Sequence, residues 1–152
     1  MEQTERNGTC LFMYREVKSE VLRMLVPGLA DVQGADGAAE SLTAAVMLGL
    51  RERFGNVEHL QATLMNEPLP DNSGLRKTYL ALYDTVPGGT GYLKQLSDPD
   101  TMFEVLAKAK EVMEHCECAK NGGDGCYRCL YAYRQSQNLK LISRKTALAM
   151  LT

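Results

Sequence analysis

The sequence contains no apolar run that approaches the roughly twenty residues of a membrane-spanning helix. Its first eight residues also lack the positively charged and apolar regions of a secretory signal. Neither a membrane span nor export is indicated by these residues. We therefore expect a cytoplasmic protein that has no membrane partner.

Catalytic signatures are missing as well. The Walker motif requires Gly-x-x-x-x-Gly-Lys-Ser/Thr, whereas Gly91 is followed by Tyr92 and Lys94 is displaced. No paired carboxylates and no base beside a nucleophile stand out. ATP binding is not supported, and we expect a protein that is not an enzyme. An enzyme that uses the loop 84–91 on a phosphate ester is kept as a third hypothesis.

The length of the chain indicates its number of domains, and the distribution of charge along it indicates possible partners. The chain has 152 residues, 45% of them apolar, which is enough to bury a core as one domain over residues 1–152. Residues 1–118 carry eleven Lys/Arg against eighteen Asp/Glu, and residues 119–152 carry six against Asp124 alone. The positive charge of this C-terminal quarter could compensate the negative charge of a metal site, bind phosphate, or lie against the acidic remainder of the chain.

Four of the five cysteines fall within fourteen residues, as a Cys-x-Cys followed by a Cys-x-x-Cys: Cys116, Cys118, Cys126 and Cys129. In a reducing compartment, cysteines this close indicate a metal rather than disulfides. Four thiolates suit one tetrahedral, structural Zn²⁺, and the glycines between the two pairs allow the backbone to turn around the ion. The sequence thus predicts a zinc knuckle over residues 115–135.

Three alternatives to this assignment remain. An iron–sulfur cluster also uses four thiolates, although the common ferredoxin spacings differ from this one. Free or redox-active cysteines are another possibility. His115 could replace one cysteine as a ligand, but four cysteines already fill a tetrahedron. Cys10 lies far away in an apolar run, Cys10–Tyr14, and is most simply a buried apolar thiol.

The hydrophobic pattern predicts an α+β fold: a small mixed sheet with packed helices and the zinc knuckle at the C-terminal end. Strands are expected at 17–26, 60–65 and 78–83, with a further edge strand at 10–14. Helices are expected at 38–54, 90–96, from Asp98 to the first zinc cysteines, at 127–138, and from Arg144 onward. His59 is interpreted as an ordinary surface histidine.

A glycine-rich stretch follows the strand at 78–83 and contains Gly88, Gly89, Thr90 and Gly91. A strand that passes through such a turn into a helix can direct backbone N–H groups at an anion. The stretch can equally be a tight turn that lets the next helix pack against the strand. Asp84 just before it is interpreted as a turn cap rather than a functional carboxylate.

The segment after the second cysteine pair interleaves aromatic and basic residues. Tyr131 and Arg134 lie along one face of the expected helix, and Arg128 lies between the two cysteines of that pair. Tyrosines and arginines together can stack bases and hold phosphates of single-stranded nucleic acid. The same side chains could instead wrap the zinc knuckle and pack on the core.

Two motifs in order carry a resemblance to a known family. The stretch Leu82-Tyr-Asp-Thr-Val-Pro-Gly-Gly-Thr-Gly-Tyr-Leu93 precedes a helix, the Cys-x-Cys, then Gly-Cys-Tyr-Arg-Cys-Leu-Tyr-Ala-Tyr and a later Leu-x-x-Arg. Together they resemble the C-terminal zinc-binding domain of bacterial MrfA-type helicases, a former domain of unknown function also found in DISARM-type phage-defence proteins. The resemblance covers most of residues 17–152.

The resemblance implies a module attached to superfamily 2 DNA helicases in DNA repair or phage defence, with the four clustered cysteines as zinc ligands. The chain departs from those helicases because it has no Walker A motif, no DEAD/DEAH box and no arginine finger. We therefore expect the terminal piece of a helicase, a split subunit or a free-standing copy.

Two functions are consistent with this placement. In the first, the domain braces a helicase motor or contacts single-stranded or junction DNA. In the second, it is a protein-interaction subunit that docks a helicase or defence partner without binding DNA itself.

Overall fold

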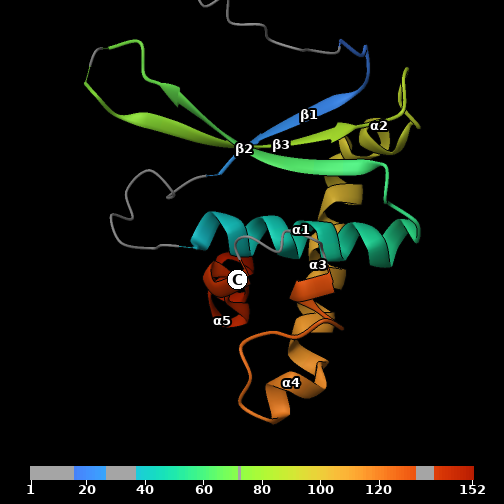
Figure 1. Cartoon of the computed structure of the whole chain (residues 1–152), viewed down its shortest axis with the longest axis vertical. Helices are drawn as coiled ribbons and strands as arrows, with labels where there is room; N and C mark the ends of the chain where they lie inside the picture. The colour runs from blue at the N-terminus through green and yellow to red at the C-terminus, as the bar shows by residue number, and fades with distance from the viewer. Residues whose placement is uncertain (1–15, 27–36, 72, 133–138) are drawn as a thin grey trace, which may run out of the picture.

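The structure is a computed structural model, and it describes residues 16–26, 37–71, 73–132 and 139–152. Figure 1 shows the arrangement of the helices and strands. In chain order these elements are β1 (Val21–Leu25), α1 (Ala38–Phe54), β2 (Leu60–Pro68), β3 (Arg76–Asp84), α2 (Tyr92–Leu96), α3 (Pro99–His115), α4 (Glu117–Lys120), the 3-10 helices η1 (Leu130–Ala132) and η2 (Leu139–Leu141), and α5 (Arg144–Leu151).

The three strands form one antiparallel sheet in the order β1-β3-β2. The strands β2 and β3 make a hairpin, and β1 pairs along the other side of β3. Alternate residues point to opposite faces of a strand, so Leu80 and Leu82 of β3 share the inner face with Leu22 and Ala62 beside them. The inner face therefore presents a continuous apolar surface to the helices.

The helix α1 packs beneath this inner face, and α3 crosses α1 at the back (Figure 1). Val46 and Leu50 of α1 lie in the main core with Leu80 and Leu82. The crossing is close because Gly49 has no side chain: a Cβ at that position would collide with the carbonyl oxygen of Val105 in α3. This glycine lets the two longest helices approach each other.

A second apolar cluster lies on the opposite face of α1. Ala44, Ala45 and Leu48 pack there with Met113 of α3 and Ala147 of α5. Cys129 and Leu130 are buried in the same cluster, and the other three clustered cysteines lie against it. The predicted metal site is thus part of a core.

The predicted α+β class with a C-terminal cysteine cluster is confirmed. The expected mixed sheet is wrong for the described strands, which pair only in antiparallel fashion. The helix expected from residue 127 is also wrong in its described part, which contains a turn and the short η1. Residues 10–14 and 133–138 lie outside the described residues, as does the end of the predicted 115–135 knuckle.

Within the described residues, no helix has both the length and the apolar character required to cross a bilayer.

Candidate metal centre

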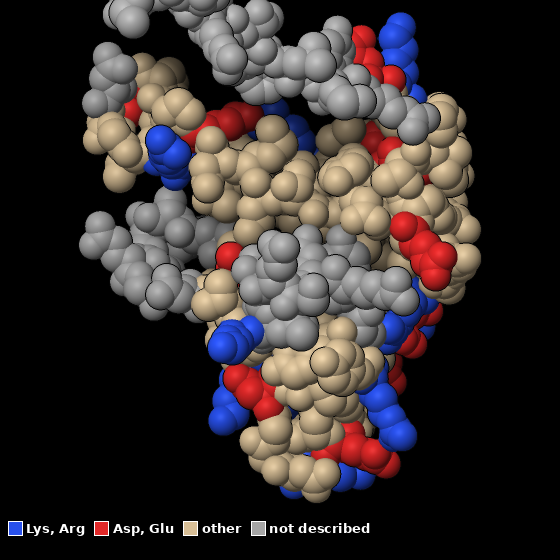
Figure 2. Space-filling view, in the orientation of Figure 1, with Lys and Arg blue, Asp and Glu red and all other residues tan. Residues whose placement is uncertain are grey.

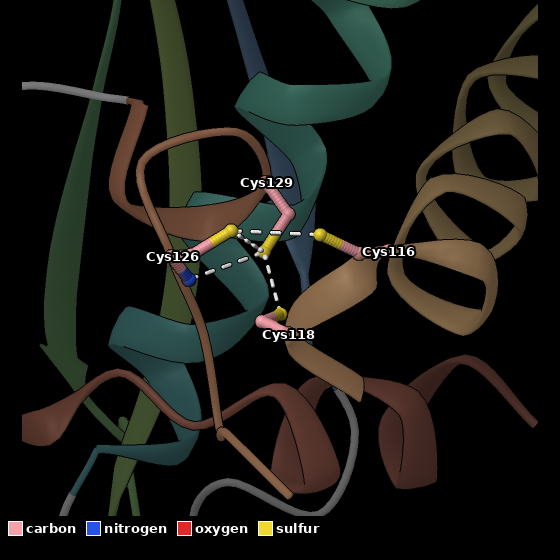
Figure 3. Close-up of side chains that lie close together, drawn as sticks. All are labelled: Cys116, Cys118, Cys126 and Cys129. Atoms are coloured by element: carbon pink, nitrogen blue, oxygen red, sulfur yellow. Dashed lines mark hydrogen bonds between the residues drawn. The ribbon is translucent and has the colours of Figure 1, made fainter. Parts of the chain in front are cut away.

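The four clustered cysteines come from two short segments that face each other across a glycine-rich loop (Figure 3). Cys116 is the residue at which α3 ends and α4 begins, and Cys118 lies within α4. Cys126 and Cys129 lie in the turn that leads into η1. A hydrogen bond from the Gly123 N–H to the Cys118 carbonyl oxygen, 2.7 Å long, folds the loop back onto α4. The local chain thereby brings both pairs together.

The sulfur positions fit one tetrahedral metal ion. All four Sγ atoms lie within 4.8 Å of one another. The Sγ–Sγ distances are 3.5 Å for Cys116–Cys126 and 3.7 Å for both Cys118–Cys129 and Cys126–Cys129. Zinc–sulfur bonds of about 2.3 Å give a tetrahedron edge of about 3.8 Å. A disulfide would need about 2.05 Å, so this spacing suits a shared cation and not a disulfide.

The thiols differ in their tendency to ionise. Burial raises the pKa of Cys118, and the surrounding cysteine thiols raise it further. Burial also raises the pKa of Cys129. At Cys126 burial acts in the same direction, but the Arg128 N–H and the thiols of Cys116 and Cys129 lower the pKa to about 7. Several neighbouring thiolates are therefore unfavourable together unless a cation compensates them, which is what Zn²⁺ supplies when bound.

The helix α5 holds the outer side of the cysteine loop. The Arg144 guanidinium donates two hydrogen bonds to the Gly123 carbonyl oxygen, both 3.4 Å long. The Arg144 N–H donates to the Asp124 carbonyl oxygen at 2.8 Å, and the Lys145 N–H donates to the Asp124 carboxylate at 2.9 Å. The acidic Asp124 thus caps the N-terminal end of α5, where negative charge is favoured.

Sequence reasoning missed this clamp. Its signal is the Leu-x-x-Arg pattern that ends at Arg144, which by itself indicates only a family resemblance. The contact of Arg144 with the loop spans 21 residues. The isolated Asp124 in a basic segment is a second signal, because a lone carboxylate there suggests a local partner.

The aromatic and basic residues near the site have different surroundings. The Tyr131 ring packs against Gly125, where a Cβ would lie only 2.8 Å from the Tyr131 Cζ atom. Tyr127 instead exposes 74% of its surface, and its ring meets Tyr131 edge-on at 6.0 Å. The Arg128 side chain is 79% exposed and pairs with Glu117 at 3.0 Å. Arg134 lies outside the described residues.

The glycine-rich loop before α2 uses its N–H groups internally. The N–H groups of Gly88 and Gly89 donate to the carbonyl oxygens of Lys18 and Val86, respectively, both at 2.9 Å. The Thr90 N–H donates to the Asp84 carboxylate at 2.7 Å, and the Gly91 N–H donates to the Glu20 carboxylate at 3.2 Å. An anion would have to displace these acceptors. The anion-binding expectation stays a prediction, and these hydrogen bonds count against it.

Asp84 acts as the predicted turn cap. It is buried, and its carboxylate accepts hydrogen bonds from the Val86 N–H at 2.8 Å and from both the N–H and the hydroxyl of Thr90. His59 is half-buried: its Nε2 atom is buried without a hydrogen-bond partner among the described residues, and its ring lies 5.2 Å from that of Tyr92.

Comparison with known proteins adds a finding independent of this geometry. Residues 42–130 match the family described as the MrfA Zn-binding domain, which is more than half of the chain. The chain belongs to this family. No curated protein and no solved structure matches it.

Membership in the MrfA zinc-binding family and the four neighbouring cysteines together fit a single structural Zn²⁺. The family match runs from α1 to Leu130 and contains both cysteine pairs. Residues 131–152 lie beyond it, although α5 clamps the cysteine loop. The centre therefore includes a supporting element outside the matched segment.

Proposed function

We propose that this domain is a non-catalytic, cytoplasmic zinc module of a DNA helicase system, in which it braces the motor or contacts nucleic acid. Cys116, Cys118, Cys126 and Cys129 hold one Zn²⁺ whose role is to fix the loop that carries Tyr127 and Arg128. The observation that carries this proposal is the four-sulfur cluster within a chain of the MrfA zinc-binding family. The motor itself belongs to another segment or subunit.

The exposed ring of Tyr127 beside Arg128 supports a nucleic-acid contact at the zinc end of the molecule. An exposed aromatic ring can stack on a base, and an adjacent guanidinium can bind phosphate. The Arg128–Glu117 pair is largely exposed, so it contributes at most about 1 kcal/mol and can be exchanged for a phosphate contact. Tyr131 supports this surface from below by packing on Gly125.

The charge distribution supports the same surface. Figure 2 shows basic side chains at the lower end of the molecule, interspersed with acidic ones. Lys120 in α4, Arg128 between the second pair of cysteines and Lys145 in α5 are all exposed. The proposal also includes Arg134 as a nucleic-acid-binding residue on its sequence alone, because it belongs to the basic C-terminal segment.

Fluorescence polarisation with labelled single-stranded and junction DNA, over a series of salt concentrations, tests the proposal. We expect salt-sensitive binding by the zinc-loaded protein. The double substitution Arg128→Ala/Arg134→Ala should weaken binding and reduce the slope of log affinity against log salt by about 0.7 for each phosphate that the variant no longer neutralises. Tyr127→Ala should weaken binding with little change in that slope.

A double substitution that removes the same amount of charge provides the control. Lys94 and Lys108 are exposed on α2 and α3, away from the cysteine loop. Lys94→Ala/Lys108→Ala should therefore leave DNA binding nearly unchanged. If both double variants bind DNA as tightly as the wild type, the nucleic-acid surface does not include Arg128 and Arg134.

A second function is favoured by the acidic excess over residues 1–118. In this alternative the domain docks a helicase or defence partner through protein contacts and does not bind DNA itself. Co-purification that survives nuclease treatment, together with no DNA binding in the polarisation assay, supports this alternative. Release of the partner by nuclease treatment supports the nucleic-acid contact.

A further inference from the structure

The strand β1 lies at an edge of the sheet, and among the described residues it pairs only with β3. At its start, the Glu20 carbonyl oxygen accepts a hydrogen bond from the Asp84 N–H of β3 at 3.1 Å. Successive residues of an antiparallel strand direct their hydrogen-bonding groups to alternate sides. The N–H and carbonyl groups of Val21, Arg23 and Leu25 therefore point away from β3, along the free edge of β1.

The side chains of β1 are only partly covered on both faces of the sheet. On the outer face, Val21 and Leu25 expose 61% and 51% of their surfaces. On the inner face, Leu22 and Met24 pack against the main core but are only half-buried. Leu80, on the inner face of the neighbouring β3, is completely buried. The apolar core is thus incomplete along the free edge of β1.

Arg23 is the one charged residue of β1, and its side chain extends over the middle of the sheet. The guanidinium lies 4.4 Å from the centre of the Tyr79 ring of β3 and pairs with Glu67 of β2 at 2.7 Å. Natural edge strands commonly carry a charge or a proline that prevents further pairing. This strand has no proline, and its charge is directed away from the free edge.

We propose that the free edge of β1 binds an extended segment of another polypeptide, which adds a fourth strand to the sheet. An extended backbone matches a row of donors and acceptors that repeats every second residue, whereas a helix bonds its backbone groups internally. The added segment carries apolar side chains on both faces, next to Leu22 and Met24 on one side and to Val21 and Leu25 on the other. This contact is independent of the nucleic-acid surface at the zinc end.

The charge beyond β1 defines one end of this segment. Leu25 lies opposite Tyr79, and β3 continues past that pair to Arg76 and Lys77. Both cations are exposed, and neither forms an ion pair within the described part of the chain. They lie beside the end of an added strand that is next to Leu25. Acidic residues at that end of the segment complement them.

A second copy of this chain fits the free edge less well. In the symmetric antiparallel register that pairs all five residues of β1, Arg23 lies opposite the same residue of the other copy. Like charges directly opposite each other destabilise a pair of strands. The occupant is therefore a different polypeptide, with an apolar strand and an acidic end.

Two synthetic peptides test the proposal, Glu-Glu-Val-Ile-Thr-Val-Val and its reverse, because the added strand can run in either direction. We expect one of them to shift the NMR signals of the Val21, Arg23 and Leu25 amides of the zinc-loaded protein and to slow their hydrogen exchange. A copy of that peptide with every core amide N-methylated should not bind, because it lacks the backbone donors.

Three variants locate the contact. Leu25→Pro removes one outward N–H at a position where an edge strand tolerates proline, and it should weaken peptide binding by about fivefold. Arg76→Glu/Lys77→Glu should weaken binding of the acidic peptide and favour a copy with lysine in place of glutamate. Phe103→Ala removes an apolar side chain that is 69% exposed on α3, and should have no effect. None of these changes should alter DNA binding in the polarisation assay.

The opposite results overturn the proposal. Unchanged signals for the three amides with both peptides would show that the free edge does not accept a strand. Equal binding of the N-methylated copy would show that the contact does not use backbone hydrogen bonds. Wild-type affinity in Leu25→Pro, with circular dichroism showing a folded protein, would place the peptide elsewhere. Slow exchange without peptide that disappears on dilution would identify a second copy of the chain as the occupant.

Discussion

Asp84 determines the shape of the glycine-rich loop through its charge. Burial by itself raises the pKa of this carboxyl group, but hydrogen bonds from Thr90 and Val86 and the nearby His59 lower it, so the pKa lies below its ordinary value of 3.8. A group whose pKa is lower in the folded state stabilises the fold above its ordinary pKa. That contribution disappears as the pH falls through the folded-state value.

The substitution Asp84→Asn should therefore destabilise the protein in a pH-dependent way. At pH 7 we expect a decrease of about 2 kcal/mol in the free energy of unfolding, because an amide cannot replace the charged acceptor for the Val86 and Thr90 donors. The gap between wild type and variant should shrink as the pH falls below 3.8. Urea titrations at matched pH values measure this gap.

Glu111→Gln, on the exposed side of α3, is the matched control and should remain close to wild type at every pH. A gap for Asp84→Asn that is the same at pH 7 and at pH 3 would contradict the assignment of a charged cap.

For single residues, the sequence predicts those contacts whose partners lie close by in the chain. The four cysteines can be assigned because metal ligands at a short spacing restrict the chain strongly, and the cap at Asp84 can be assigned because its partners follow within six residues. The hydrogen bond from Gly91 to Glu20 joins positions 71 residues apart. No local pattern indicates such a contact, which is why the sequence alone also allows an anion site in this loop.

The helix α5 contains no cysteine, but it supports the loop between the two cysteine pairs. It carries Arg144 and the N–H groups that bind Asp124, and its Ala147 is buried in the core cluster that contains Cys129. The clamp therefore couples the position of a helix to the geometry of the cysteine loop. A loop without this support should release its metal more readily.

The substitution Arg144→Ala should accelerate zinc release to a chelating indicator by about tenfold, because it removes contacts that together contribute about 1.4 kcal/mol. Lys145→Ala removes the same charge but keeps the Lys145 N–H that bonds to Asp124, so it should release zinc at nearly the wild-type rate. Equal release rates for the two variants would show that the guanidinium contacts do not support the loop.

Predictions of elements succeed where the pattern is periodic and fail near the metal. The helix expected at 38–54 agrees with α1, because its apolar residues repeat at the helical spacing. The segment from Tyr127 has a similar pattern, but residues 127–129 form a turn and only the short η1 follows it in the described part of the chain. The expected mixed sheet is wrong because strand direction depends on connections that a local pattern does not reveal.

At the scale of the whole molecule, the described residues form two apolar clusters that share α1. One lies between the sheet and the helices, and the other contains Cys129 and the helices near it. Metal binding contributes to folding only where the ligands are anchored. Zinc should therefore stabilise the second cluster more than the first.

Removal of zinc by a chelator should raise hydrogen exchange most in η1, α4 and α5. The amides that pair β2 with β3 should stay protected, because their core contains no cysteine of the site. Exchange measured by mass spectrometry on the loaded and chelated protein tests this difference. A uniform rise over both clusters would show that the metal supports the fold as a single cooperative unit.

One zinc ion held by four cysteines is the central claim, and native mass spectrometry with elemental analysis tests it most directly. We predict one zinc per chain in the wild type and in Cys10→Ser, and absent or strongly weakened zinc binding in each of Cys116→Ser, Cys118→Ser, Cys126→Ser and Cys129→Ser. Iron in place of zinc, no bound metal, or a requirement for Cys10 would contradict it.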